Sequence, residues 1–230
     1  MKCNSTVRSA NLLLLPVLLL LPLKELCAQD KMNAFQQALA QNQKRLRQYR
    51  WVETTIISLK GEEKSRSVKQ CFYGPDGKVQ KQVISAPPPQ KMPGGLRGKI
   101  AANKKEEVTD YMNRAVNLVH QYIPPNPELI QGARASGNVS LTPGPAGLRL
   151  DLRNFLKPND LFSLTVDTKS LSILKANVNS YMDDPKDVVT LNVTFAFLPN
   201  GVDYPGNIVL QAPEKKIQVV VQNSNYYPVK

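Results

Sequence analysis

The sequence predicts an α+β fold: a strongly curved antiparallel sheet of about nine or ten strands, forming a half β-barrel, with two helices in its concave face. Many short runs alternate apolar and polar residues, as VVTLNVTFAF does at residues 188–197, and this period of two is typical of half-buried strands. The connections between the runs are short and rich in turn formers, which predicts antiparallel neighbours. A sheet of this many strands curls, and only two segments have helical periodicity.

The expected elements follow the chain in a simple order. Residues 30–50 and 103–122 place apolar side chains at helical spacing after a capping residue. Alternating runs predict strands at residues 51–59, 65–73, 78–85, 138–142, 147–154, 160–167, 172–181, 187–198, 206–212 and 215–223. Two proline-rich segments, residues 86–99 and 123–137, predict loops. The first could also be an interdomain linker, but neither flank looks complete alone, so we expect one domain.

Residues 1–28 have the organisation of a secretory signal peptide. A charged start precedes an apolar run at residues 12–21, and the small residue Ala28 follows. The apolar run is too short to span a bilayer. We therefore predict cleavage after Ala28, a mature domain at residues 29–230, and a periplasmic or secreted location. Lipid anchoring at Cys27 is the alternative, although a large residue, not a small one, precedes this cysteine.

The basic charge is concentrated in the first half of the mature chain. Residues 29–114 hold 17 basic and 8 acidic side chains, whereas residues 115–230 hold 10 and 9. A basic surface can dock on an acidic envelope protein or on an anionic membrane, and export argues against nucleic acid. The candidate docking residues are Lys91, Arg97, Lys99, Lys104 and Lys105.

The sequence contains no pattern typical of catalysis or of metal or cofactor binding. His120 is the single histidine, so a zinc site of familiar spacing cannot form. Cys71 alternates within a strand pattern, which favours a buried small hydrophobic residue over a nucleophile. The acidic run at residues 183–187 lacks the glycine and distal glutamate of a calcium loop and is typical of a turn. We therefore expect a non-enzymatic protein without a cofactor.

The C-terminal half resembles the LolA/LolB-like lipoprotein carriers, the outer membrane lipoprotein-sorting proteins. The similar stretch runs from Asp160 to Val221: a strand ending in VD, a T-x-x-L-x-x-L edge, another strand, NG, YP and a closing strand. The resemblance implies a half-barrel whose helices close an apolar cavity for acyl chains. The carriers also place an arginine on an early strand to hold these helices. Arg50 and Arg66 lie in that region, but no motif assigns the role to either.

The function expected from these observations is an exported, non-enzymatic carrier of an apolar ligand, such as a lipid or a lipoprotein acyl chain. An acyl chain would leave water for a cavity between the curved sheet and the helices. The alternative is an envelope interaction or structural module, whose core is filled by its own helices and whose basic face docks a partner. The candidate cavity residues are Phe162, Leu164, Leu191, Val193, Phe195 and Phe197.

Overall fold

The computed structural model of the chain describes residues 23–85, 95–123 and 127–229. The chain divides into two compact units between Gln37 and Ala38. The second unit, Ala38–Lys230, contains the whole sheet, and the candidate site lies within this unit.

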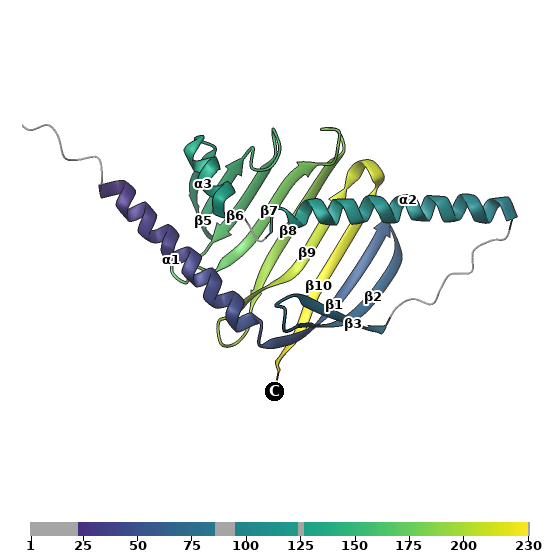
Figure 1. Cartoon of the computed structure of the whole chain (residues 1–230), viewed down its shortest axis with the longest axis horizontal. Coiled ribbons are helices and arrows are strands. Elements are labelled where there is room, and N and C mark those ends of the chain that lie inside the picture. The colour runs from purple at the N-terminus through teal and green to yellow at the C-terminus, as the bar shows by residue number, and fades with distance from the viewer. Residues whose placement is uncertain (1–22, 86–94, 124–126, 230) are drawn as a thin grey trace, which may run out of the picture. The chain divides into compact units, whose positions relative to one another are not determined.

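A single ten-stranded antiparallel sheet dominates the fold (Figure 1), in the order β3-β2-β1-β10-β9-β8-β7-β6-β5-β4. Each strand pairs with its neighbour in sequence except at one place, where β1 pairs with β10. The two edge strands, β3 and β4, do not pair with each other, so the sheet stays open and the predicted half-barrel class is confirmed. The strands are β1 (Tyr49–Leu59), β2 (Glu62–Tyr73), β3 (Val79–Ser85), β4 (Val139–Gly144), β5 (Gly147–Arg153), β6 (Leu161–Val166), β7 (Ile173–Tyr181), β8 (Val188–Phe197), β9 (Asp203–Ala212) and β10 (Ile217–Pro228).

The helices differ from the prediction in number and in their bounds. The described residues form three α-helices and a short 3-10 turn: α1 (Leu23–Leu46), α2 (Gly95–His120), α3 (Pro127–Ala135) and η1 (Pro213–Lys215). The first helix ends before residue 50, because Tyr49 already pairs with β10. No described helix has the length and apolar character that a membrane crossing needs.

Both predicted loops contain helix. Helix α2 begins at Gly95, so the last five residues of the predicted 86–99 loop are helical, whereas residues 86–94 lie outside the described part of the chain. Helix α3 occupies much of the predicted 123–137 loop, with Pro127 as its first residue. Proline is tolerated in the first turn of a helix, because the N–H group it lacks has no partner there.

One apolar row crosses the sheet and defines its inner face. Residues directly opposite each other on paired strands share a face, so the register links the row strand by strand. The side chains are 0% exposed at Leu152 and Phe162, 3% at Val178 and Leu191, 5% at Leu210 and 7% at Val219. The row from β5 to β1 is Leu152, Phe162, Val178, Leu191, Leu210, Val219 and Ile57.

A buried polar network fixes the C-terminal end of α2 to this core. The Tyr122 hydroxyl donates to Asp160 at 2.6 Å and shares a 2.8 Å hydrogen bond with the Ser180 hydroxyl. The Asp160 carboxylate also accepts three backbone N–H groups, those of residues 155–157, at 2.5–2.8 Å. The Tyr122 ring packs against Phe155 and Phe162. The β5–β7 side of the inner face is therefore closed.

Candidate ligand-binding face

The cover on the inner face is incomplete at the middle of β1, where Thr55 and Ile57 are half-buried. In the neighbouring row of inner-face residues, Val193 on β8 is 5% exposed. The residues paired with it in turn across β9, β10 and β1 are half-buried. Apolar side chains in this zone therefore meet solvent on the same face that is closed elsewhere. We call these half-buried residues the inner window: Thr55, Ile57, Ile208 and Val221.

Helix α2 is fastened beyond one end of the window. The Tyr111 hydroxyl donates to Asp187, in the β7–β8 turn, at 2.6 Å, and Arg114 pairs with Asp183 at 2.9 Å. The Lys215 ammonium, in η1, lies 5.5 Å from the centre of the Tyr111 ring. Burial and the hydrogen bond to Asp187 raise the pKa of Tyr111, so its hydroxyl remains a donor at physiological pH.

The last turns of α1 are fastened beyond the opposite end, at the β8–β9 turn. The Asn42 amide donates to the backbone oxygen of Asp203 at 2.7 Å and accepts its N–H at 3.0 Å. Arg45 donates to the backbone oxygen of Asn200, whose side chain in turn donates to the Tyr49 hydroxyl at 2.7 Å. The described attachments of the two helices thus lie at opposite ends of β8, and the window lies between these ends.

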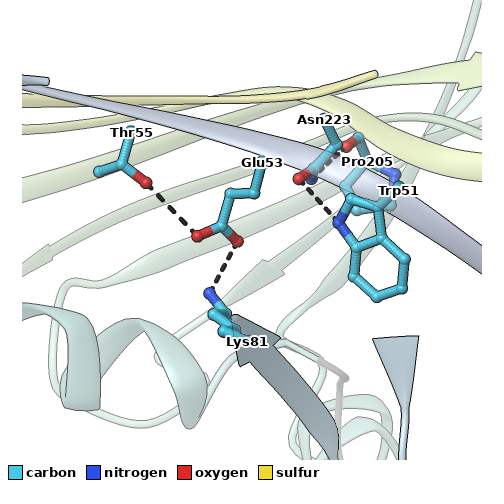
Figure 2. A network of polar contacts seen from close by, with 6 residues as sticks. All are labelled: Trp51, Glu53, Thr55, Lys81, Pro205 and Asn223. Carbon is cyan, nitrogen blue, oxygen red and sulfur yellow. Dashed lines mark hydrogen bonds and ion pairs between the residues drawn. The ribbon is translucent and has the colours of Figure 1, made fainter. Parts of the chain in front are cut away.

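A polar network occupies the row beside the window (Figure 2). Glu53 is 7% exposed; its carboxylate accepts from Lys81 at 2.7 Å and from Thr55 at 3.4 Å. The Trp51 indole donates to the Asn223 side chain at 3.1 Å, and the Asn223 amide donates to the backbone oxygen of Pro205 at 2.8 Å. A buried carboxylate needs a cation and hydrogen-bond donors, and this arrangement supplies both.

An aromatic cluster closes the far side of this network. Trp51 is 6% exposed and stacks on Tyr226, with ring centres 5.5 Å apart and planes 7° from parallel. Tyr73 lies 5.5 Å from the Trp51 ring, and Tyr204 lies 4.1 Å from Tyr226. Burial raises the pKa of Tyr226, which keeps its hydroxyl neutral. Along the strands, the window therefore lies between aliphatic residues on one side and a polar, aromatic border on the other.

Cys71, on β2, is directly opposite Trp51 of this border and is fully buried. Burial and, next, the Glu53 carboxylate raise the pKa of its thiol to about 11, while Lys81 and Lys69 act in the opposite direction. The thiol is therefore protonated at neutral pH, and the structure places Cys71 as a buried small residue. In the described ranges, no three His, Cys, Asp or Glu side chains are grouped closely enough to hold a metal ion.

Four of the six predicted cavity residues lie in the closed part of the inner face. They are at most 5% exposed, and the Phe162 ring packs against Tyr122 and Phe155. An acyl chain would reach them only after the helical cover moved, so their contact with a ligand stays a prediction. These residues are Phe162, Leu164, Leu191 and Val193.

Phe195 and Phe197 lie at the end of β8 that leads into the β8–β9 turn. Phe195 is half-buried and follows the register shift after Thr194, whereas Phe197 is 48% exposed and pairs with Asp203 beside the β8–β9 turn. The Phe197 ring is thus the more accessible of the two.

Replacing Phe197 with alanine is expected to lower the free energy of unfolding by about 1 kcal/mol, because a ring this exposed loses few packing contacts. The same change should weaken the uptake of a fluorescent fatty-acid probe. Urea denaturation and probe titration measure the two effects. A loss of about 3 kcal/mol or more would show that Phe197 is a packed core residue.

The predicted docking residues are on or before α2. Lys91 lies outside the described residues, and Arg97, Lys99, Lys104 and Lys105 lie along α2, without described side chains. Their docking role therefore stays a prediction.

Neither of the two early arginines faces the window. The Arg50 guanidinium lies over the Phe72 ring at 5.3 Å, and Arg66 forms an ion pair with Glu63 at 2.8 Å. Both alternate with inner-face residues of their strands and so lie on the outer face.

The polar border of the window was not predicted from the sequence. In WVETTIISL, Glu53 lies in phase with Trp51, Thr55 and Ile57, which places a carboxylate on the apolar face of the strand. This phase was the feature of the sequence from which a polar residue on the inner face could have been predicted. Lys81 and Asn223 carry no such signal, because only the pairing of distant strands brings them to Glu53 and Trp51.

A separate surface pocket of about 520 Å³ lies beside the β1–β2 turn. Its lining combines basic, polar and apolar residues and includes no window residue: Lys60, Gly61, Gln211, Pro213, Lys216, Ile217 and Gln218.

No family model matches the sequence, and no curated protein matches it significantly. Among solved structures, the chain is similar to a DUF1329 family protein from Desulfovibrio piger, with 10% identity and a TM-score of 0.39; the alignment covers 86% of this chain and 92% of that one. It is also similar to MucB in its complex with MucA(peri), with 10% identity and a TM-score of 0.24, over 86% of this chain and 99% of that one. Both scores are too low to establish a common fold, so neither similarity supports a conclusion about function.

Proposed function

We propose that this protein is an exported, non-enzymatic carrier of an apolar ligand, most simply an acyl chain of a lipid or lipoprotein, which binds on the inner window. The observation that carries the proposal is the change in exposure along one face of one sheet. The apolar row is 0% exposed at Phe162 and 7% exposed at Val219, and it ends half-buried at Ile57.

An acyl chain fits this surface for a simple physical reason. The window residues other than Thr55 are aliphatic, and they face water between the attachments of two helices. Covering them with hydrocarbon removes apolar area from water on both partners, at roughly 0.8 kcal/mol for each methylene buried. The resemblance of residues 160–221 to lipoprotein carriers points to the same ligand class.

A matched pair of valines tests this proposal. Val221 lies in the inner window, and Val220, next to it on β10, lies on the outer face; both are half-buried. We expect Val221→Gln to weaken binding of a fluorescent fatty-acid probe about tenfold, because the amide must lose its hydration under the ligand. Val220→Gln should leave the affinity unchanged, and thermal unfolding should show similar stability for the two variants.

The opposite pattern would reject the site. If Val220→Gln weakened the probe as much as Val221→Gln, the ligand would lie elsewhere. If the wild-type protein bound no probe at all, the carrier function itself would fail.

The alternative function is an envelope interaction module with a filled core, and the close burial of Leu164 and Leu191 favours it. In that case the basic first half would dock an acidic protein or an anionic membrane.

Docking of this kind should be sensitive to salt, because exposed charges are screened over about 10 Å at 0.1 M ionic strength. We expect binding to anionic vesicles to weaken as salt is raised, and the combined change of Lys104 and Lys105 to glutamine to reduce it further at low salt. Vesicle sedimentation measures both effects. Binding that is absent at low salt, or unaffected by salt, would leave these lysines as ordinary solvated residues.

A further inference from the structure

The border of the window has an excess of positive charge. Glu53 is directly opposite Lys69 on β2, and Lys81 on β3 forms an ion pair with Glu53. Lys69 has no ion-pair partner among the described residues. Two ammonium groups therefore flank one carboxylate, and one positive charge has no counterion beside an apolar surface.

The hydrogen-bonding capacity of the border points to an anion and not to a cation. Glu53 is buried, and both of its oxygens already accept a hydrogen bond, one from Lys81 and one from Thr55. An ammonium group carries three donors, and the Lys81 side chain is 44% exposed, so it can donate to a second acceptor. The border therefore presents exposed N–H donors to a ligand, whereas its carboxylate is buried and already accepts from Lys81 and Thr55.

The border and the window are adjacent along the strands. Glu53 is two residues before Thr55 on β1, and Asn223 is two residues after Val221 on β10, which is a separation of roughly 7 Å. A molecule that lies on the window can thus place its polar end at the two lysines.

We infer that the ligand of the inner window is an amphiphile with an anionic headgroup, a carboxylate or a phosphate, which binds at Lys69 and Lys81 while its hydrocarbon chain covers Val221 and Ile57. This inference rests on the proposed function and adds the chemistry of the headgroup. Glu53 holds the Lys81 ammonium on the inner face; without it, a lysine on an exposed edge strand would extend into solvent.

Three ligands separate the headgroup from the chain: dodecanoate, its methyl ester and inorganic phosphate, each used to displace a fluorescent fatty-acid probe. We expect the wild-type protein to bind dodecanoate about fivefold more tightly than the ester, the size of effect that a partly exposed ion pair supplies. Inorganic phosphate at the same concentration should displace no probe, because it lacks the chain.

Lys69→Gln is the decisive variant, because it removes a charge without breaking the Glu53–Lys81 pair. We expect it to reduce the preference for dodecanoate to about twofold or less, with no change in binding of the ester. Lys175→Gln is the matched control: this lysine also lies on a strand but is exposed on the outer face, and the variant should keep the full preference.

Each other outcome overturns a defined part of the inference. Equal binding of dodecanoate and ester by the wild type, or equal behaviour of the two lysine variants, would reject the headgroup site and leave the carrier function standing. Displacement by phosphate alone would indicate a simple anion site. If neither dodecanoate nor the ester bound, the proposed function would be rejected as well.

Discussion

Replacing Asp160 with alanine is expected to lower the free energy of unfolding by about 3–5 kcal/mol. Asp160 is 2% exposed and accepts from three backbone N–H groups and from the Tyr122 hydroxyl. The alanine variant would leave three buried or part-buried backbone donors without their acceptor and would leave Ser180 as the remaining partner of the Tyr122 hydroxyl, so α2 would lose one of its attachments to the core. Urea denaturation followed by circular dichroism measures the loss.

Asp167→Ala provides the matched control. Asp167 also accepts two backbone N–H groups, those of Lys169 and Ser170, but it does so in an exposed turn, where water can replace it. We expect this variant to lose about 1 kcal/mol or less. If Asp160→Ala cost no more than Asp167→Ala, the buried network would not hold α2.

Replacing Trp51 with alanine is expected to cost about 3–5 kcal/mol, because the indole fills the space between Tyr226 and Tyr73 and its removal leaves a void. The change also leaves the Asn223 oxygen without its donor. Thermal and urea unfolding both report the loss.

Tyr227→Ala is the comparison for Trp51. Tyr227 pairs with Arg50, is 41% exposed, and its hydroxyl accepts a hydrogen bond from the Gln70 amide. We expect a loss of about 1 kcal/mol or less. Equal losses for the two variants would show that the aromatic cluster adds little to the border of the window.

The strands were predictable because each carries its own alternation. Residues 172–181 and 187–198 match β7 and β8 to within one residue at either end. The start of β9 was missed, since Pro205 and Gly206 lie within it, where a bulge shifts the register after Thr194. Because of their prolines and glycines, the start of α2 and all of α3 were also predicted as loops.

The site was less predictable than the fold, because it depends on strand pairing. No local sequence pattern indicates that Lys81 on β3 contacts Glu53 on β1. The same is true of Trp51 and Asn223, which are 172 residues apart in the chain. From the sequence, the cavity was predicted at the most apolar strands. Those strands carry the best-covered side chains, and the half-buried surface lies where the apolar pattern is interrupted by Thr55 and Glu53.

The measurement that tests the carrier proposal most directly is native mass spectrometry of the protein, purified without detergent. We expect a fraction of the molecules to carry a non-covalent lipid, which is lost on denaturation, and we expect Val221→Gln to carry less of it than Val220→Gln. Protein that carries no lipid, and also takes up no fatty-acid probe when one is supplied, would contradict the proposal and favour the interaction module with a filled core.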